Sequence, residues 1–200
     1  MKHLLSVFVL PAVSLILFST SAHAHIPSGE YGSFASGFTH PLFGFDHLLA
    51  MIAVGLWASM IGKRAVWAVP AIFVCMMIAG FGLALMQMPL PFVEPMILAS
   101  VIVFGFALAI AVRIDARLCA VLVGLFALFH GHAHGGEIGD AGAMQFTFGF
   151  VLATALLHLA GIGIGLLAPR ISASLDLSSN TPYRALGAVT IVTGVLLTVS

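Results

Sequence analysis

Charge is what this sequence has least of. Only 7% of its 200 residues are Asp, Glu, Lys or Arg, against about 25% in a typical soluble domain, whereas 61% are hydrophobic. So few charges cannot cover a surface that faces water, which excludes a soluble globular domain. The formal net charge is zero, so the charge balance indicates neither a nucleic-acid partner nor an acidic one. We therefore predict an all-α, polytopic membrane helix bundle.

Cysteine is scarce as well. Cys75 lies in the middle of an apolar run and Cys119 near the start of another, so we expect no disulfide and interpret both as small packing residues. The lack of a cluster of thiolates argues against a tight structural zinc site. The sequence also lacks a glycine-rich nucleotide-binding motif, so nothing indicates a process driven by ATP.

The first residues have the form of a signal peptide. Lys2 supplies the positive charge, Leu4–Phe18 the apolar region and Ala22–Ala24 a cleavage site of the A-x-A type. We predict that residues 1–24 are removed and that residues 25–200 form the membrane domain, with an uncleaved anchor as the alternative. Cleavage after Ala24 leaves His25 first, where its α-amine and imidazole could chelate one metal ion, unless a histidine is merely tolerated at this cleavage site.

Six apolar segments of the mature chain are long enough to cross a bilayer, which takes about 20 residues. They are Phe38–Ile61, Val66–Met86, Glu94–Val112, Leu118–His134, Met144–Ala168 and Pro182–Ser200. All basic residues of the mature chain flank the first, third and fifth connections: Lys63, Arg64, Arg113, Arg117, Arg170 and Arg184. Positive charge marks the cytoplasmic side, so we predict six spans, a periplasmic N-terminus and a multi-pass protein of the bacterial inner membrane. Trp57 and Trp67 flank the first connection and are predicted to anchor the membrane interface.

Ionisable residues open the first predicted span. His40, Asp46 and His47 lie within a few residues, and each ionisable group in a membrane helix costs about 2.5–3.5 kcal/mol on insertion scales, so such groups are usually functional. Asp46 could bind a metal ion itself or orient an imidazole as a hydrogen-bond acceptor. Met51 lies one turn beyond His47, where it is a packing residue or a thioether ligand.

The spacing of the two histidines leaves two possibilities. His40 and His47 are about 10 Å apart along a straight helix, too far to share one ion. Either Pro41 and Gly44 break the helix early, or the two histidines are successive stations.

A second cluster closes the fourth predicted span. His130 and His134 have the i, i+4 spacing that lets two imidazoles bind one metal ion, and Glu137 follows on the same face. His132 points elsewhere. His158 lies deeper in the fifth span, where it either binds metal or hydrogen-bonds a neighbouring helix. Whether the two clusters meet depends on the topology of the bundle.

Imidazole and carboxylate together suit Ni, Co, Zn, Cu or Fe(II), and residue chemistry alone does not choose among them. The candidate metal ligands are His25, His40, Asp46, His47, Met51, His130, His134, Glu137 and His158. We predict no catalytic residue and no prosthetic group.

Two motifs resemble those of the HupE/UreJ family of bacterial nickel permeases. The first, H-P-x-x-G-x-D-H-x-x-x-M, is matched from His40 to Met51, and the second, F-H-G-x-A-H-G-x-E, from Phe129 to Glu137. The larger nickel/cobalt transporter family has H-x4-D-H, one residue fewer between its histidines than here. The resemblance implies uptake of Ni(II), or of Co(II) as in some relatives, to supply hydrogenase or urease.

We therefore expect a secondary permease that carries Ni(II) from periplasm to cytoplasm. Its expected partners are the metal ion and the lipid bilayer, with no nucleic acid, and its oligomeric state is open. The alternatives are a Co(II) permease, an intramembrane metalloenzyme that uses the same ligands, and a metal sensor without transport. The enzyme alternative lacks the H-E-x-x-H motif and would need Asp46 or Glu137 as its base.

Overall fold

The computed structural model describes residues 33–138 and 142–199, and this part of the chain is helical with no strand. Its helices are α2 (Ser33–Phe43), α3 (Phe45–Ile61), α4 (Ala65–Leu85), α5 (Val93–Ala109), α6 (Ala116–Glu137), α7 (Ala143–Ser174) and α8 (Thr181–Leu197). The predicted all-α class is confirmed. The predicted signal peptide and His25 lie outside the described residues.

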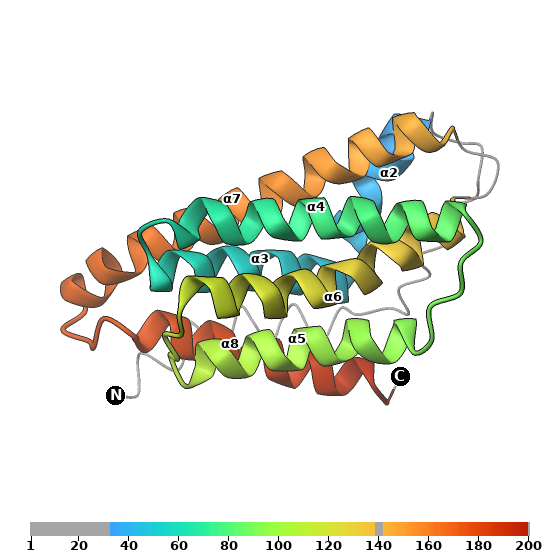
Figure 1. The fold of residues 1–200 in the computed structure, drawn as a ribbon. Helices are drawn as coiled ribbons and strands as arrows, with labels where there is room; N and C mark the ends of the chain where they lie inside the picture. Colours follow the sequence, from blue (N-terminus) through green and yellow to red (C-terminus); the bar gives the residue numbers. More distant parts are fainter. Residues whose placement is uncertain (1–32, 139–141, 200) are drawn as a thin grey trace.

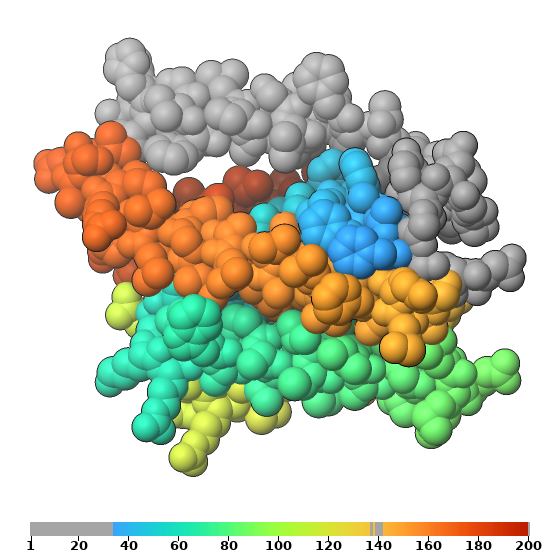
Figure 2. Space-filling model, turned by 90° about the horizontal axis from the view of Figure 1, so that it is seen from above, coloured from blue at the N-terminus to red at the C-terminus, as the bar shows by residue number. Residues whose placement is uncertain are grey.

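Helices α3 to α8 run along one common direction as a bundle, and α2 crosses at one end (Figure 1). The main contacts pair α4 with α6, α5 with α8, and α7 with both α2 and α3. Figure 2 shows α2 beside α7 on one face of the molecule. Helix α3 lies in the middle, where it also contacts α4 and α5, and ten of its residues are buried. The core therefore forms around the helix that follows Gly44.

The described helices divide by length. Helices α4, α6 and α7 are each long and apolar enough to cross a membrane, and α2 and α3 pass the same test as one bent pair. Helices α5 and α8 are apolar helices of 17 residues each, about 25 Å long, against a hydrocarbon core of about 30 Å. Helices thus occupy all six predicted segments, and length and composition support three spans, or four with the bent pair.

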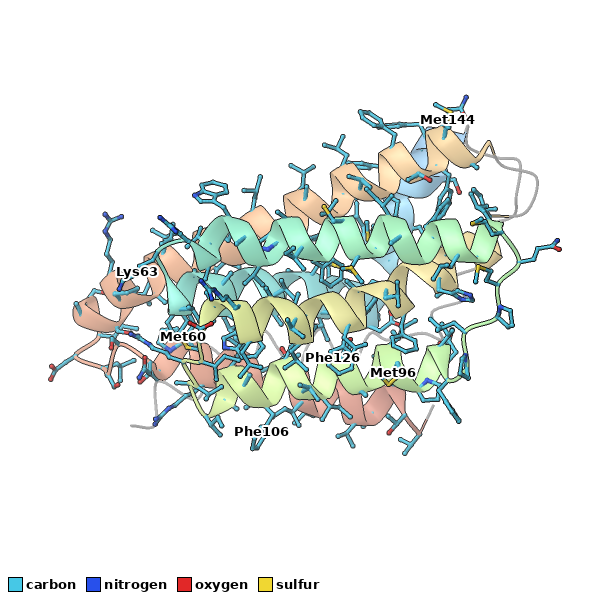
Figure 3. All side chains as sticks on the ribbon, viewed as in Figure 1. Met60, Lys63, Met96, Phe106, Phe126 and Met144 are labelled. Atoms are coloured by element: carbon cyan, nitrogen blue, oxygen red, sulfur yellow. The ribbon has the colours of Figure 1, made fainter. Side chains whose placement is uncertain are left out.

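The surface of the bundle is apolar. Large hydrophobic side chains that are more than half exposed occur on several helices, among them Trp67, Phe106, Val121 and Met144. In Figure 3, Phe106 and Met144 project away from the bundle, and Lys63 lies at the end opposite Met144. An apolar surface of this extent is suited to lipid, so the chain is a multi-pass membrane protein.

Glycines bring the helix backbones into direct contact. A Cβ atom at Gly80 would overlap the carbonyl of Leu128, and one at Gly131 would overlap the carbonyl of Met77, so α4 and α6 touch along their backbones. Gly55 has the same role between α3 and α7. Small residues at such crossings are how membrane helices gain close packing where the lipid provides no hydrophobic driving force.

One tryptophan differs from its prediction. Trp67 is 68% exposed, which fits an interface anchor, but Trp57 is only 1% exposed. The indole Nε1 of Trp57 donates to the carbonyl of Val112 at 2.9 Å, just beyond the end of α5. Carbonyls at a helix end lack partners within the helix, so a buried indole satisfies this one. The prediction that Trp57 anchors the interface is wrong.

Candidate metal centre

A sharp bend at Gly44 shapes the site. Helices α2 and α3 meet at 81° there, and Gly44 has extended backbone angles of φ −82° and ψ 111°. Pro41 lies in the last turn of α2. The bend brings the ring centroids of His40 and His47 to 6.3 Å, instead of the 10 Å or so of a straight helix. Of the two possibilities that the spacing left open, the structure has the early break.

Asp46 holds the His47 ring. Its Oδ1 accepts from both the backbone N–H and the Nδ1 of His47, each at 2.8 Å. Because a carboxylate favours an N–H partner, Nδ1 carries a ring hydrogen, and in the neutral imidazole Nε2 then has the lone pair. That Nε2 is buried and has no hydrogen-bond partner among the residues that the structure describes. The geometry of Asp46 is that of an orienting acceptor, one of its two predicted roles.

Four histidines from three helices meet at this bend. The ring centroid of His134 lies 4.5 Å from that of His40 and 4.3 Å from that of His47, and His47 lies 4.8 Å from His130. His130 and His134 are almost completely buried. The two motifs therefore come together, although they are far apart in the sequence. We call His40, His47, His130 and His134 the histidine cluster.

Ser100 was missed by the sequence reasoning. It is a fully buried residue of α5, and its Oγ lies 2.9 Å from Nε2 of His130. The same Oγ donates to the carbonyl of Ile97 at 2.6 Å. The only signal in the sequence is a single hydroxyl within an apolar helix, which is too common a feature to single out by itself.

Aromatic rings surround the histidine cluster. Phe150 of α7 lies 4.2 Å from His134 between centroids, and Phe146 lies 6.2 Å from His40. Phe73 of α4 lies 5.8 Å from His130. These rings exclude water, and electrostatic interactions are stronger in the resulting medium of low dielectric constant.

His158 lies next to the cluster rather than in it. Its ring packs edge-on against Phe73, 4.9 Å between centroids, and Phe73 also contacts His130. His158 is buried, and neither of its ring nitrogens has a hydrogen-bond partner within the described residues. The predicted alternative of a hydrogen bond to a neighbouring helix is therefore absent from this part of the chain.

The remaining residues that the sequence singled out are not members of the histidine cluster. Met51 is fully buried in the hydrophobic core. Glu137 is the last residue of α6, and its side chain, like His25, lies outside the described part of the structure. His132 faces away, with Nε2 at 2.9 Å from the carbonyl of Met88. Within residues 33–138 and 142–199, no three His, Cys, Asp or Glu side chains form a ready coordination shell.

The fold and the site together define a class: a multi-pass membrane helix bundle with buried histidines at a helix break. Residues 13–197 match the family described as HupE / UreJ protein, and the chain belongs to that family. "Protein HupE" of Rhizobium leguminosarum bv. viciae is 44% identical over 147 residues, which cover 73% of this chain and 76% of that relative. The family resemblance of the two motifs is thus confirmed. No solved structure matches the chain significantly.

Proposed function

We propose that the protein carries a divalent transition-metal ion, Ni(II) first and Co(II) as the close alternative, from periplasm to cytoplasm. The observation that supports this most is the histidine cluster, which gathers four imidazoles from three helices inside an otherwise apolar bundle. Membership in the HupE/UreJ family, which is associated with nickel and cobalt uptake, supports the same function. The membrane that the protein crosses is, on this proposal, the bacterial inner membrane.

The donor set suits a cargo that must leave again. Nε2 of His47 is a buried imidazole nitrogen without a hydrogen-bond partner among the described residues, and the nearby carboxylate of Asp46 offsets part of the ion's charge. Imidazole nitrogens lie at about 2 Å from a bound transition metal, so adjacent rings reach one ion by modest rotation. Among the residues that the structure describes, no three such side chains already form a coordination shell, which suits a site that both binds and releases the ion.

A route follows from the order of the side chains. His40, which is half-buried, and Glu137 at the end of α6 take up the ion from outside, and His134 and then His47 and His130 receive it. His158 is the next imidazole inward, beyond the ring of Phe73. The negative potential inside the cell supplies about 4.6 kcal/mol per 100 mV for a dication. We propose no catalytic step at this site.

Uptake of radioactive nickel into proteoliposomes that contain the purified protein tests this function. We expect uptake above that of empty liposomes, increased by an inward-negative potential and reduced by an excess of Co(II). Protein in which His47 is replaced by Ala is the matched control. If the intact protein takes up no more nickel than empty liposomes, while it binds nickel normally, it is not a carrier. Equal reduction by Mg²⁺ would contradict a site built from imidazoles.

A further inference from the structure

The hydroxyl of Ser100 has two neighbours but only one hydrogen to donate. Its Oγ lies 2.6 Å from the carbonyl oxygen of Ile97 and 2.9 Å from Nε2 of His130. Two oxygens 2.6 Å apart with no hydrogen between them would repel each other, so the hydroxyl hydrogen points to Ile97. Towards His130 the Oγ can then act only as an acceptor, and Nε2 of His130 must carry the hydrogen of that bond.

This fixes which nitrogen of His130 is able to bind a metal ion. A neutral imidazole has one N–H and one lone pair, so a hydrogen on Nε2 leaves the lone pair on Nδ1. Nδ1 of His130 is buried and has no hydrogen-bond partner in the described part of the chain. We propose that Ser100 is a positioning residue that holds His130 in the Nε2–H tautomer and leaves Nδ1 as the metal-binding nitrogen. The assignment of Nδ1 as the metal-binding nitrogen rests on the proposed function.

The two adjacent rings of the cluster are then held in opposite ways. His47 gives its Nδ1 hydrogen to Asp46 and keeps the lone pair on Nε2, whereas His130 gives its Nε2 hydrogen to Ser100. Partners that orient a ligating histidine fix its tautomer and raise its basicity, and a carboxylate raises it more than a neutral hydroxyl does. Ser100 therefore orients His130 without adding a second negative charge, and His130 is the weaker of the two ligands. A weaker ligand favours release of the cargo.

The tautomer can be measured directly on the full-length, metal-free protein. With ¹⁵N-labelled histidine in lipid nanodiscs, the ring nitrogen shifts distinguish the two tautomers, and His130→Gln identifies the signals of His130. We expect the Nε2–H tautomer in the intact protein and a mixture, or the Nδ1–H form, in Ser100→Ala. A Nδ1–H tautomer in the intact protein, or an unchanged tautomer in Ser100→Ala, overturns the proposal.

Ser59 provides a matched control on α3. Its Oγ donates to the carbonyl of Leu56 at 2.6 Å, which is the same i−3 bond that Ser100 makes to Ile97. Ser59→Ala removes that bond without removing a partner of His130, so the tautomer of His130 should stay as it is. A change of equal size in Ser59→Ala would show that the effect is one of general packing, and it would overturn the specific role of Ser100.

Nickel binding by the same proteins tests the second part of the proposal, which is that Nδ1 of His130 binds the metal ion. Loss of a residue that orients a metal ligand typically costs 10- to 100-fold in metal affinity, so Ser100→Ala should bind nickel about tenfold or more weakly. Ser100→Thr keeps the hydroxyl and should retain most of the affinity, and Ser59→Ala should match the intact protein. Intact affinity in Ser100→Ala overturns the positioning role. If these results hold but the intact protein does not transport nickel, the proposed transport fails and the role of Ser100 stands.

Discussion

At the scale of single residues, the chemistry of this protein lies in polar atoms enclosed by apolar ones. A buried polar group without a hydrogen bond costs about 1–3 kcal/mol, so a stable fold rarely keeps one without a function. Within the described part of the chain, Nε2 of His47 and Nδ1 of His130 are two such atoms, on rings that touch each other. In each ring the other nitrogen is hydrogen-bonded, to Asp46 and to Ser100 respectively. This pattern supports the proposal that the two rings are oriented for binding a metal ion.

Removing one of these imidazoles should stop transport. We expect His47→Ala and His130→Ala to lower nickel uptake by at least about 100-fold at equal amounts in the membrane, because each loses a ligand and not only an orienting partner. His132→Ala is the control, since His132 belongs to the same segment but bonds the Met88 carbonyl away from the cluster. Uptake near that of the intact protein in either cluster variant would remove that histidine from the route.

Gly44 lies directly against the hydrogen-bonded pair of Asp46 and His47. A Cβ atom there would lie 3.0 Å from Oδ1 of Asp46 and 3.2 Å from Nδ1 of His47. Alanine fits the backbone, because φ is −82°. We therefore expect Gly44→Ala to fold normally, to displace the hydrogen-bonded pair by a few tenths of an ångström and to weaken nickel binding several-fold.

The measurements for this variant are nickel affinity and thermal unfolding in detergent. Gly136→Ala is the control, because a Cβ atom there would meet nothing within 4 Å. A Gly44→Ala protein that binds nickel as the intact protein does would show that the Asp46–His47 pair tolerates the displacement. A large loss of thermal stability would instead place the role of Gly44 in the bend itself.

At the scale of helices, the apolar runs were sufficient to predict where helices occur, because each run is about as long as a membrane is thick. They did not predict the 81° bend. Pro41 and Gly44 allow a break, but its angle depends on the packing of α2 against α7, which is a long-range contact. Trp57 was misjudged for a similar reason, since its partner is the distant Val112 carbonyl. Ser100 was missed because its importance comes from a histidine on another helix.

The glycines of α4 give a test at this scale. Gly80 lies against the backbone of α6 with no room for a Cβ atom, whereas Gly82 on the same helix has nothing within 4 Å. Gly80→Ala should force α4 and α6 apart and lower the unfolding free energy by about 1–3 kcal/mol. Gly82→Ala should be neutral or stabilising by up to about 1 kcal/mol, because alanine favours a helix over glycine.

Unfolding of the purified protein in mixed micelles, monitored by circular dichroism, would measure both changes. A loss of stability in Gly80→Ala with no loss in Gly82→Ala is the expected result. Equal losses would mean that the contact between α4 and α6 does not depend on close approach of their backbones at Gly80.

At the scale of the whole molecule, the pairing of helices determines the site. The two motifs were visible in the sequence, and their chemistry was predicted from it, but their meeting depends on how α2, α3 and α6 come together at one end of the bundle. The connections α3–α4, α5–α6 and α7–α8 lie together at the other end (Figure 1). These connections and the adjacent helix ends carry all the basic residues of the segment 25–200. The two ends of the bundle therefore differ, with the histidine cluster at one end and the basic residues at the other.

The uneven distribution of basic residues predicts which connections face each side of the membrane. In a background in which Cys75 and Cys119 are replaced by alanine, single cysteines at Gln87, Asp115 and Ser179 report on the connections α4–α5, α5–α6 and α7–α8, where each of these residues is exposed. A membrane-impermeant maleimide added to intact spheroplasts should label Gln87→Cys alone, and all three after permeabilisation. The reason is the positive-inside rule, which places the two connections next to basic residues in the cytoplasm.

The short helix α5 is the sensitive part of the test. If α5 does not cross the membrane, Gln87→Cys and Asp115→Cys lie on the same side and label together, and the six-span topology is wrong.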